Sequence, residues 1–198
     1  KEQSDNKPLV SEELKTLFNT TSRRYALIEG EIMGLIGEYG KAYNDILASL
    51  KGYEKATSLT TLEKHHKEYL AAVERSKSLA DNIADRSDLL FTSKTNSLLM
   101  FADSLGMDSL RVDYTALSEQ TESAISEKLM GKCTDLDLAM YPHRLLGTFR
   151  LEAQLAKHLA PEAADSLLSR TEEFDTTFTL FSPYGTPKRS NAKFTAVS

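Results

Sequence analysis

Apolar residues recur every three or four positions near the start of the chain, from Leu14 to Tyr53. This spacing places their side chains on one face of an α-helix and is typical of helices that pack together lengthwise. Because no proline interrupts the segment, it predicts one helix over residues 11–56, roughly 65–70 Å long at about 1.5 Å per residue. A rod of that length favours an extended antiparallel bundle or a dimer. The seam consists of Leu14, Phe18, Tyr25, Ile28, Ile32, Leu35, Tyr39, Tyr43, Ile46, Leu50 and Tyr53.

Helical patterns with their own start and stop signals follow along the rest of the chain. A second apolar stripe ends at Gly106, and Asp108 and Thr134 can cap two further helices. Pro142 predicts a kink or a delayed start in the fourth helix, whereas Pro161 suits the first position of a fifth. The predicted helices cover residues 11–56, 61–105, 108–130, 134–159 and 161–174. The stripe of the second helix is predicted to contain Leu62, Tyr69, Val73, Ala80, Ile83, Leu90 and Phe101.

The two ends of the chain have a different character. Residues 1–10 are a polar lead, and residues 11–175 carry the helical bundle. From Phe174 to Leu180 apolar residues alternate with polar ones, which is the pattern of a strand. Residues 176–198 are therefore predicted to be an extended arm and a flexible tail on an otherwise all-α, elongated antiparallel bundle.

Composition excludes several classes of protein. The chain has 198 residues, a size typical of one domain, with a formal net charge of −5. This acidic balance argues against a large nucleic-acid interface, which needs a basic face. No apolar run reaches the roughly 20 residues of a membrane span. One cysteine, Cys133, allows no internal disulfide.

The compartment stays open between two predictions. The chain begins at Lys1 rather than at a methionine. Removal of an export or lipoprotein signal would place the protein in the cell envelope or periplasm. A cytoplasmic location is predicted about equally, since a single cysteine fits both.

Four glycines, Gly30, Gly34, Gly37 and Gly40, form a row in the first predicted helix. Each interior glycine costs a helix about 0.8–1 kcal/mol relative to alanine, so four together need a compensating reason. Their spacing keeps them roughly on one face, where another backbone can approach closely. The functional interpretation is a tight helix crossing at an interface with a partner or a second copy, or at a hinge, whereas close packing within the bundle is the simpler interpretation. Tyr39 and Tyr43 are candidates for the same interface because tyrosine suits partly wet contacts, although ordinary core packing is the simpler interpretation.

A basic stretch on the second predicted helix is a candidate contact surface for an acidic partner or an anionic membrane. A solvated helix face is the simpler interpretation. The residues of this patch are Lys64, His65, Lys67, Arg75 and Lys77.

No motif of the chain predicts an enzyme or a cofactor. Glu63 and His66 form one Glu-x-x-His pair, whereas di-iron bundles use two such pairs with two further glutamates, so a structural or surface role is favoured over a metal site. Cys133 and His143 give no spatial evidence of a nucleophile and its base. Zinc spacings, phosphate-binding loops and nucleophile elbows are absent from the sequence.

The sequence therefore predicts a non-enzymatic binding or scaffold protein that associates through its long helices, as a coiled-coil-like oligomer or with a protein partner. Two alternatives stay open. The long helices resemble a BAR-type membrane-binding module in outline, and the stretch from Leu98 to Leu105 is of the kind such helices contain. A second alternative is an envelope sensor or ligand-binding bundle in which the polar zone from Asp85 to Ser97 lines a pocket or forms a buried polar patch.

Overall fold

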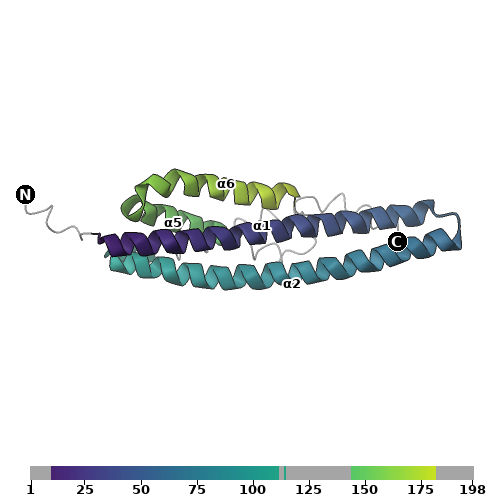
Figure 1. The fold of residues 1–198 in the computed structure, drawn as a ribbon, viewed down its shortest axis with the longest axis horizontal. Helices are drawn as coiled ribbons and strands as arrows, with labels where there is room; N and C mark the ends of the chain where they lie inside the picture. Colours follow the sequence, from purple (N-terminus) through teal and green to yellow (C-terminus); the bar gives the residue numbers. More distant parts are fainter. Residues whose placement is uncertain (1–9, 112–113, 115–143, 182–198) are drawn as a thin grey trace, which may run out of the picture.

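The computed structural model describes residues 10–111, 114 and 144–181, with side chains as far as residue 173. Its described part is helical and contains no strand, which confirms the all-α fold class (Figure 1). The elements in chain order are α1 (Glu12–Lys55), α2 (Leu59–Ser104), α5 (Leu145–Leu159), the short 3-10 helix η2 (Pro161–Ala163) and α6 (Ala164–Phe181).

Helix α1 is the single long rod that the apolar seam predicts. The Ser11 hydroxyl accepts a hydrogen bond from the backbone N–H of Leu14 at 3.1 Å and caps the first turn. Glu12 and Glu13 follow, where negative charge suits the positive end of the helix dipole. The helix has 44 residues, which corresponds to roughly 66 Å.

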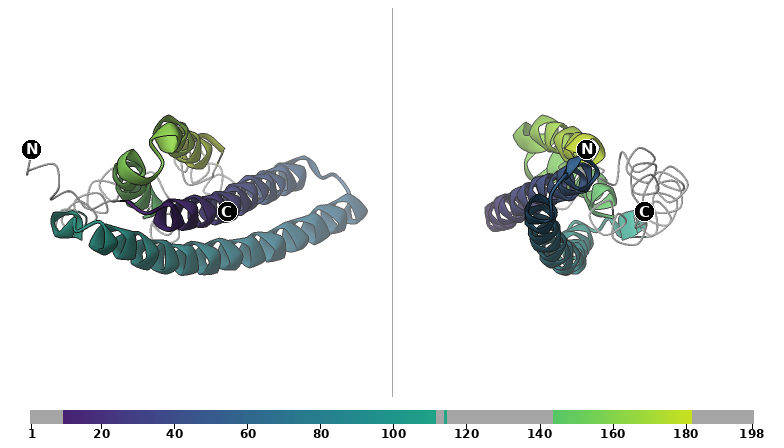
Figure 2. Two further views of the ribbon diagram at one scale, coloured as in Figure 1. Left: turned by 60° about the vertical axis from the view of Figure 1, so that its left-hand side comes forward. Right: turned by 90° about the vertical axis from the view of Figure 1, so that its right-hand side faces the viewer.

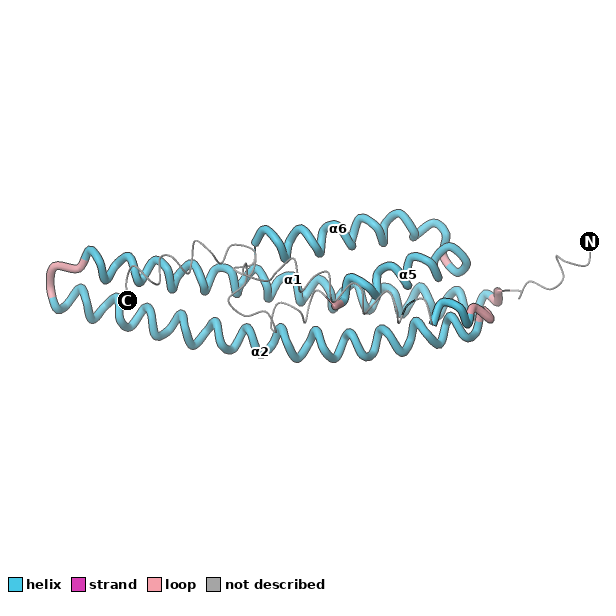
Figure 3. The backbone as a smooth tube through the Cα atoms, turned by 180° about the vertical axis from the view of Figure 1, so that it is seen from behind, coloured by secondary structure: helices cyan, strands magenta, loops and turns pink. Residues whose placement is uncertain are grey.

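Helices α1 and α2 form an antiparallel hairpin joined by residues 56–58, the tip at one end of the molecule (Figure 3). Helix α2 begins two residues earlier than predicted because Ser58 is its cap, with its hydroxyl 3.2 Å from the N–H of Thr61. At the other end of the hairpin, α2 is terminated by Gly106, whose φ is +67°. Hydrogen bonds from Gly106 to the Asp103 carbonyl and from Met107 to the Ala102 carbonyl satisfy the last turn.

Helices α5 and α6 cover only the half of the hairpin that contains the start of α1 (Figure 1). In that half α2 contacts α1 and α5, and α6 contacts α1 and α5, so the four helices form a bundle (Figure 2). Toward the tip, the described helices are α1 and α2 alone.

Two apolar clusters make up the core of the described structure. One lies at the start of α1 and includes Phe18, Phe101 and Leu155. The other lies midway along the hairpin and includes Ile32, Ile36 and Ile83, among other residues. Most seam residues of α1 are buried or partly buried, as predicted.

The structure corrects two sequence predictions. Leu62 is 39% exposed instead of part of the core, because the first turns of α2 lie at the tip. The extended arm was predicted from residue 176, but α6 continues as a helix to Phe181. Phe174, Phe178 and Phe181 also recur with the period of a helix, so the short alternation did not distinguish the two conformations.

Several predictions concern residues that the structure does not describe. They include most of the helix over 108–130, the start of the helix over 134–159, Pro142, Cys133, His143 and residues 182–198. Helix α5 begins at Leu145, and η2 begins at Pro161 as predicted.

Candidate functional site

A buried cluster of four charged residues joins all four helices of the bundle. Glu29 comes from α1, Lys94 from α2, Glu152 from α5 and Arg170 from α6. The side chains of Lys94 and Glu152 have no exposed surface, and that of Glu29 is 4% exposed. Arg170 lies at the edge, with 25% of its side chain exposed. We refer to these four residues as the charge cluster.

The distances within the charge cluster are those of close ion pairs. Lys94 Nζ donates to Glu29 Oε1 at 2.7 Å and lies 2.8 Å from Glu152 Oε2, in a direction unsuited to a hydrogen bond. Arg170 Nη2 donates to Glu29 Oε2 at 2.5 Å, and its Nη1 lies 3.7 Å from Glu152 Oε1. The Ser22 hydroxyl donates to that same Glu152 oxygen at 2.6 Å.

Aromatic rings complete the surroundings of the two cations. Lys94 Nζ lies 4.0 Å from the centre of the Phe149 ring and 5.9 Å from that of Tyr25. The guanidinium of Arg170 is 5.6 Å from the Phe149 ring. Cations over aromatic faces are stabilised electrostatically, more strongly when water is excluded.

The charge cluster is balanced, with two carboxylates facing two cations. Removing one member of a buried pair is strongly destabilising because the partner keeps its desolvation cost without compensation. Since each charge comes from a different helix, the cluster fixes how α5 and α6 sit on the hairpin. Its chemistry is therefore that of a structural clamp.

Sequence reasoning did not find this cluster, although Lys94 lies in the polar zone from Asp85 to Ser97 for which a buried polar patch was one prediction. The sequence nevertheless contains a pattern that points to buried charges. Glu29 stands at a seam position between Tyr25 and Ile32, and Lys94 stands between Leu90 and Leu98 with helical spacing. A charge on an apolar face indicates a buried partner, but it does not reveal which one.

At the tip, the Tyr53 hydroxyl lies 2.6 Å from His66 Nδ1. Tyr69 packs edge-on against Tyr53, with 6.3 Å between the ring centres. The pKa of Tyr53 is raised above its ordinary value of 10.0, mainly by partial burial and to a lesser extent by the neighbouring Tyr69. Glu63, predicted as a pair with His66, is exposed. No group of three or more metal-binding side chains converges among the described residues.

Gly52 is needed at the tip because His65 occupies the space beside it. A Cβ atom added to Gly52 would lie 2.6 Å from His65 Cγ, closer than real contacts allow. His65 Nδ1 is 3.3 Å from Glu68 Oε2, which holds the ring in this place. This glycine allows close approach of α1 and α2, although it lies outside the predicted row.

The predicted glycine row divides between the surface and the interior. Gly30 and Gly34 are exposed, Gly37 is partly exposed and Gly40 is buried. For the first three, an added Cβ would meet no heavy atom of another element within 4 Å in the described structure. Leu27, one turn earlier on the same face, is 72% exposed. We refer to Leu27, Gly30, Gly34 and Gly37 as the outer α1 face.

The two tyrosines predicted at the interface lie away from this face. Tyr43 is 9% exposed and belongs to the core, and Tyr39 packs partly buried against the middle apolar cluster. Both side chains make further contacts.

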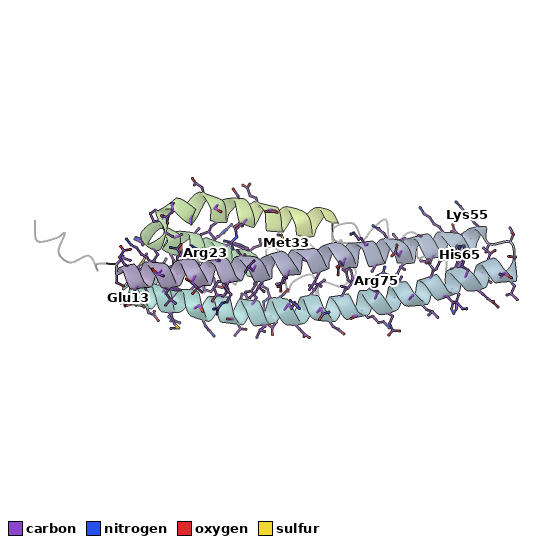
Figure 4. All side chains as sticks on the ribbon, in the orientation of Figure 1. Glu13, Arg23, Met33, Lys55, His65 and Arg75 are labelled. Atoms are coloured by element: carbon purple, nitrogen blue, oxygen red, sulfur yellow. The ribbon has the colours of Figure 1, made fainter. Side chains whose placement is uncertain are left out.

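The residues of the predicted basic patch are spread along α2 from the tip, and acidic side chains lie among them. Lys64 lies 4.0 Å from Glu68, and Arg75 pairs with Asp45 of α1. His65 and Arg75 occupy different levels of the hairpin, with Lys55 near the former at the tip (Figure 4). Lys67 and Lys77 are exposed.

Grooves lie at two levels between α1 and α2 in the part of the chain that the structure describes. One, of about 180 Å³, is mainly apolar and lies at the start of α1; its lining includes Leu14, Leu17, Met100 and Phe101. The other, of about 300 Å³, lies nearer the tip and includes Asp45 and Arg75.

No protein-family model, curated protein or solved structure matches this chain. None of the described helices combines the length and the apolar character needed to cross a lipid bilayer.

Proposed function

We propose that this protein is a non-enzymatic binding or scaffold protein that associates with another protein, or with a second copy, along the outer α1 face. The observation that carries the proposal is that, among the described residues, no atom lies within 4 Å of a Cβ placed at Gly30, Gly34 or Gly37, next to the exposed Leu27. These four positions are spaced three, four and three residues apart, so they lie along one face of α1.

The glycines motivate the proposal through their energetic cost. Three glycines in a helix interior cost roughly 2.4–3 kcal/mol relative to alanines. No contact among the described residues offsets that cost, because an added Cβ would meet open space. A helix of another chain packed against these glycines would approach closely and gain dispersion contacts along the whole face.

Replacement of glycine by alanine on this face should change the stability of the free chain and the strength of association in opposite directions. In the double variant Gly30→Ala/Gly34→Ala we expect the free chain to gain about 0.8–1 kcal/mol per site, because alanine favours the helix. Association should weaken by about tenfold or more, because the added methyl groups hold the partner helix away. Sedimentation velocity over a concentration series measures the association, and urea unfolding measures the stability.

The matched control is Asn82→Ala, an exposed helix position on α2. It should also stabilise the chain while leaving association unchanged. A second readout uses a photo-crosslinking residue at position 27 or, as its control, at position 82. A chain that stays monomeric and gives no crosslink specific to position 27 would contradict the proposal.

The two alternative functions make different predictions. A BAR-like membrane module should sediment with anionic vesicles, and substitution of Lys64 and Lys67 by glutamate should abolish this. An envelope sensor should bind a small ligand within the segment from Asp85 to Ser97. In the described structure Lys94 of that segment already has charged partners, so the outer α1 face is the better supported surface.

A further inference from the structure

Arg170 is the one member of the charge cluster that comes from α6. The groups that surround its guanidinium come from the other helices. Lys94 holds Glu29 and Glu152 at 2.7 and 2.8 Å. Ser22 holds Glu152 Oε1 at 2.6 Å. The Phe149 ring, on α5, faces both cations. None of these contacts, apart from that of the Phe149 ring with Arg170 itself, involves a residue of α6. Groups of α1, α2 and α5 thus surround the position between α1 and α5 that the Arg170 guanidinium takes, and we refer to this position as the slot.

Without Arg170 the slot would hold two carboxylates and one ammonium group, a net charge of −1 in a largely buried place. A guanidinium group fits this arrangement better than a sodium ion or an ammonium group. It is planar, it can donate to two carboxylates at once, and it is stabilised beside an aromatic face.

Helix α6 has few other buried attachments among its described side chains. Leu167 is 1% exposed, whereas Leu168 is 57% exposed. Asp165, Glu172 and Glu173 are also exposed. The Arg170 side chain itself is 25% exposed, so the slot opens to solvent at this edge.

We propose that the slot between α1 and α5 is a guanidinium-recognition site, and that α6 is an exchangeable latch. An arginine carried by an amphipathic helix of a partner protein replaces Arg170 and takes the place of α6. The proposal concerns a different surface from the outer α1 face and does not depend on association there.

The first test is chemical rescue of the full-length variant Arg170→Ala. The variant should have a lower Tm than the wild type. Guanidinium chloride at about 10 mM should raise that Tm by about 2–4 °C, because it binds the folded state. Matched sodium chloride and urea should not, and the wild type, whose slot is filled, should show no rise.

The second test uses a synthetic peptide of residues 161–181. It should bind the Arg170→Ala protein about tenfold or more tightly than it binds the wild type, because the resident latch of the wild type competes. The same peptide with Arg170→Ala should lose that preference. Fluorescence anisotropy of a labelled peptide measures both.

If the Arg170→Ala protein does not fold, it is refolded in about 10 mM guanidinium chloride or in matched sodium chloride, and recovery of helical circular dichroism in guanidinium alone replaces the Tm readout. A Tm that responds equally to guanidinium and sodium would overturn the guanidinium site. Rescue by guanidinium without peptide binding would overturn the exchange of helices. Failure of either test leaves the proposed association along α1 unaffected.

Discussion

The ammonium group of Lys94 has no exposed surface, so it depends on protein groups for the stabilisation that water would supply. Glu29 and Glu152 supply that stabilisation at 2.7 and 2.8 Å, and the Phe149 ring adds to it. An intact buried ion-pair network often stabilises a fold no more than well-packed apolar residues of the same volume would, but loss of one partner is strongly destabilising. We therefore expect the cluster to act mainly on specificity, by penalising arrangements of the helices that separate the charges.

Substitution of Lys94 by methionine should show how much stability is lost when one charge of the cluster is removed. We expect Lys94→Met to lower the free energy of unfolding by roughly 3–5 kcal/mol, because Glu152 loses its close cation. Urea unfolding followed by circular dichroism measures the change. Lys77→Met, at an exposed position of α2, is the control and should change stability by no more than about 0.5 kcal/mol. The double variant Lys94→Met/Glu152→Gln should recover part of the loss, and equal losses at Lys94 and Lys77 would refute the account.

Tyr53, the tyrosine near the tip, should lose its phenolic proton at a higher pH than a free tyrosine does. Partial burial and the neighbouring Tyr69 disfavour the phenolate of Tyr53, and its pKa is therefore raised in the folded state. The folded chain then retains a proton that the unfolded chain releases above a pH of about 10, so this residue's contribution to stability falls as the pH rises past that value.

A spectrophotometric titration tests this at 295 nm. Subtracting the curve of Tyr53→Phe from that of the wild type should isolate one phenol with a midpoint above about 10. Tyr69→Phe should lower that midpoint, because the neighbour contributes to the shift. A midpoint for Tyr53 at or below the ordinary value would contradict the partial desolvation of this residue and the effect of Tyr69.

At the scale of the elements, α1 and α2 were predictable because one local pattern specified each of them. The seam from Leu14 to Tyr53, without proline, left no break for a second element, and Gly106 supplied the residue that can adopt a positive φ. The start of α2 was less certain, because several hydroxyl residues near Ser58 were equally good caps.

The charge cluster could not be predicted because its partners are far apart in the chain. Lys94 lies 65 residues from Glu29, and Arg170 lies 141 residues from it. No spacing rule connects such positions, since the pairing follows from how four helices meet. The same reason explains why the need for Gly52 was missed: it depends on His65 across the hairpin.

The packing of α1 on α2 at the tip predicts that one substitution has different effects on stability in two backgrounds. Gly52→Ala should fail to stabilise the wild type, because its Cβ would overlap the His65 ring. In a His65→Ala background the same change should stabilise by about 0.8–1 kcal/mol, the usual gain from glycine to alanine. Urea unfolding of the four proteins completes the cycle, and equal effects in both backgrounds would show that the ring does not occupy this space.

The whole molecule is elongated because α5 and α6 extend along only part of a much longer hairpin (Figure 1). A compact domain of 198 residues would have a radius of gyration of about 16 Å. Helix α2 alone, with 46 residues, is roughly 69 Å long.

Small-angle scattering of the full chain should therefore give a radius of gyration above 20 Å, estimated roughly from the helix length. It should also give a maximum dimension of at least about 70 Å. Light scattering on the same sample separates an elongated monomer from a dimer. A monomer with the radius of a compact domain would mean that the hairpin is not straight in solution.

The extent of α5 along α2 has a mechanical consequence. The part of the hairpin held by α5 reaches beyond Lys94 to the middle apolar cluster, which contains both Leu145 of α5 and Ile83 of α2. Ile83 is 24 positions from Leu59, so the hairpin projects roughly 36 Å beyond this level. A tilt of about 5° at this pivot carries the far end through roughly 3 Å. Any event that loosens or tightens the pivot is thus geometrically amplified at Tyr53 and His66.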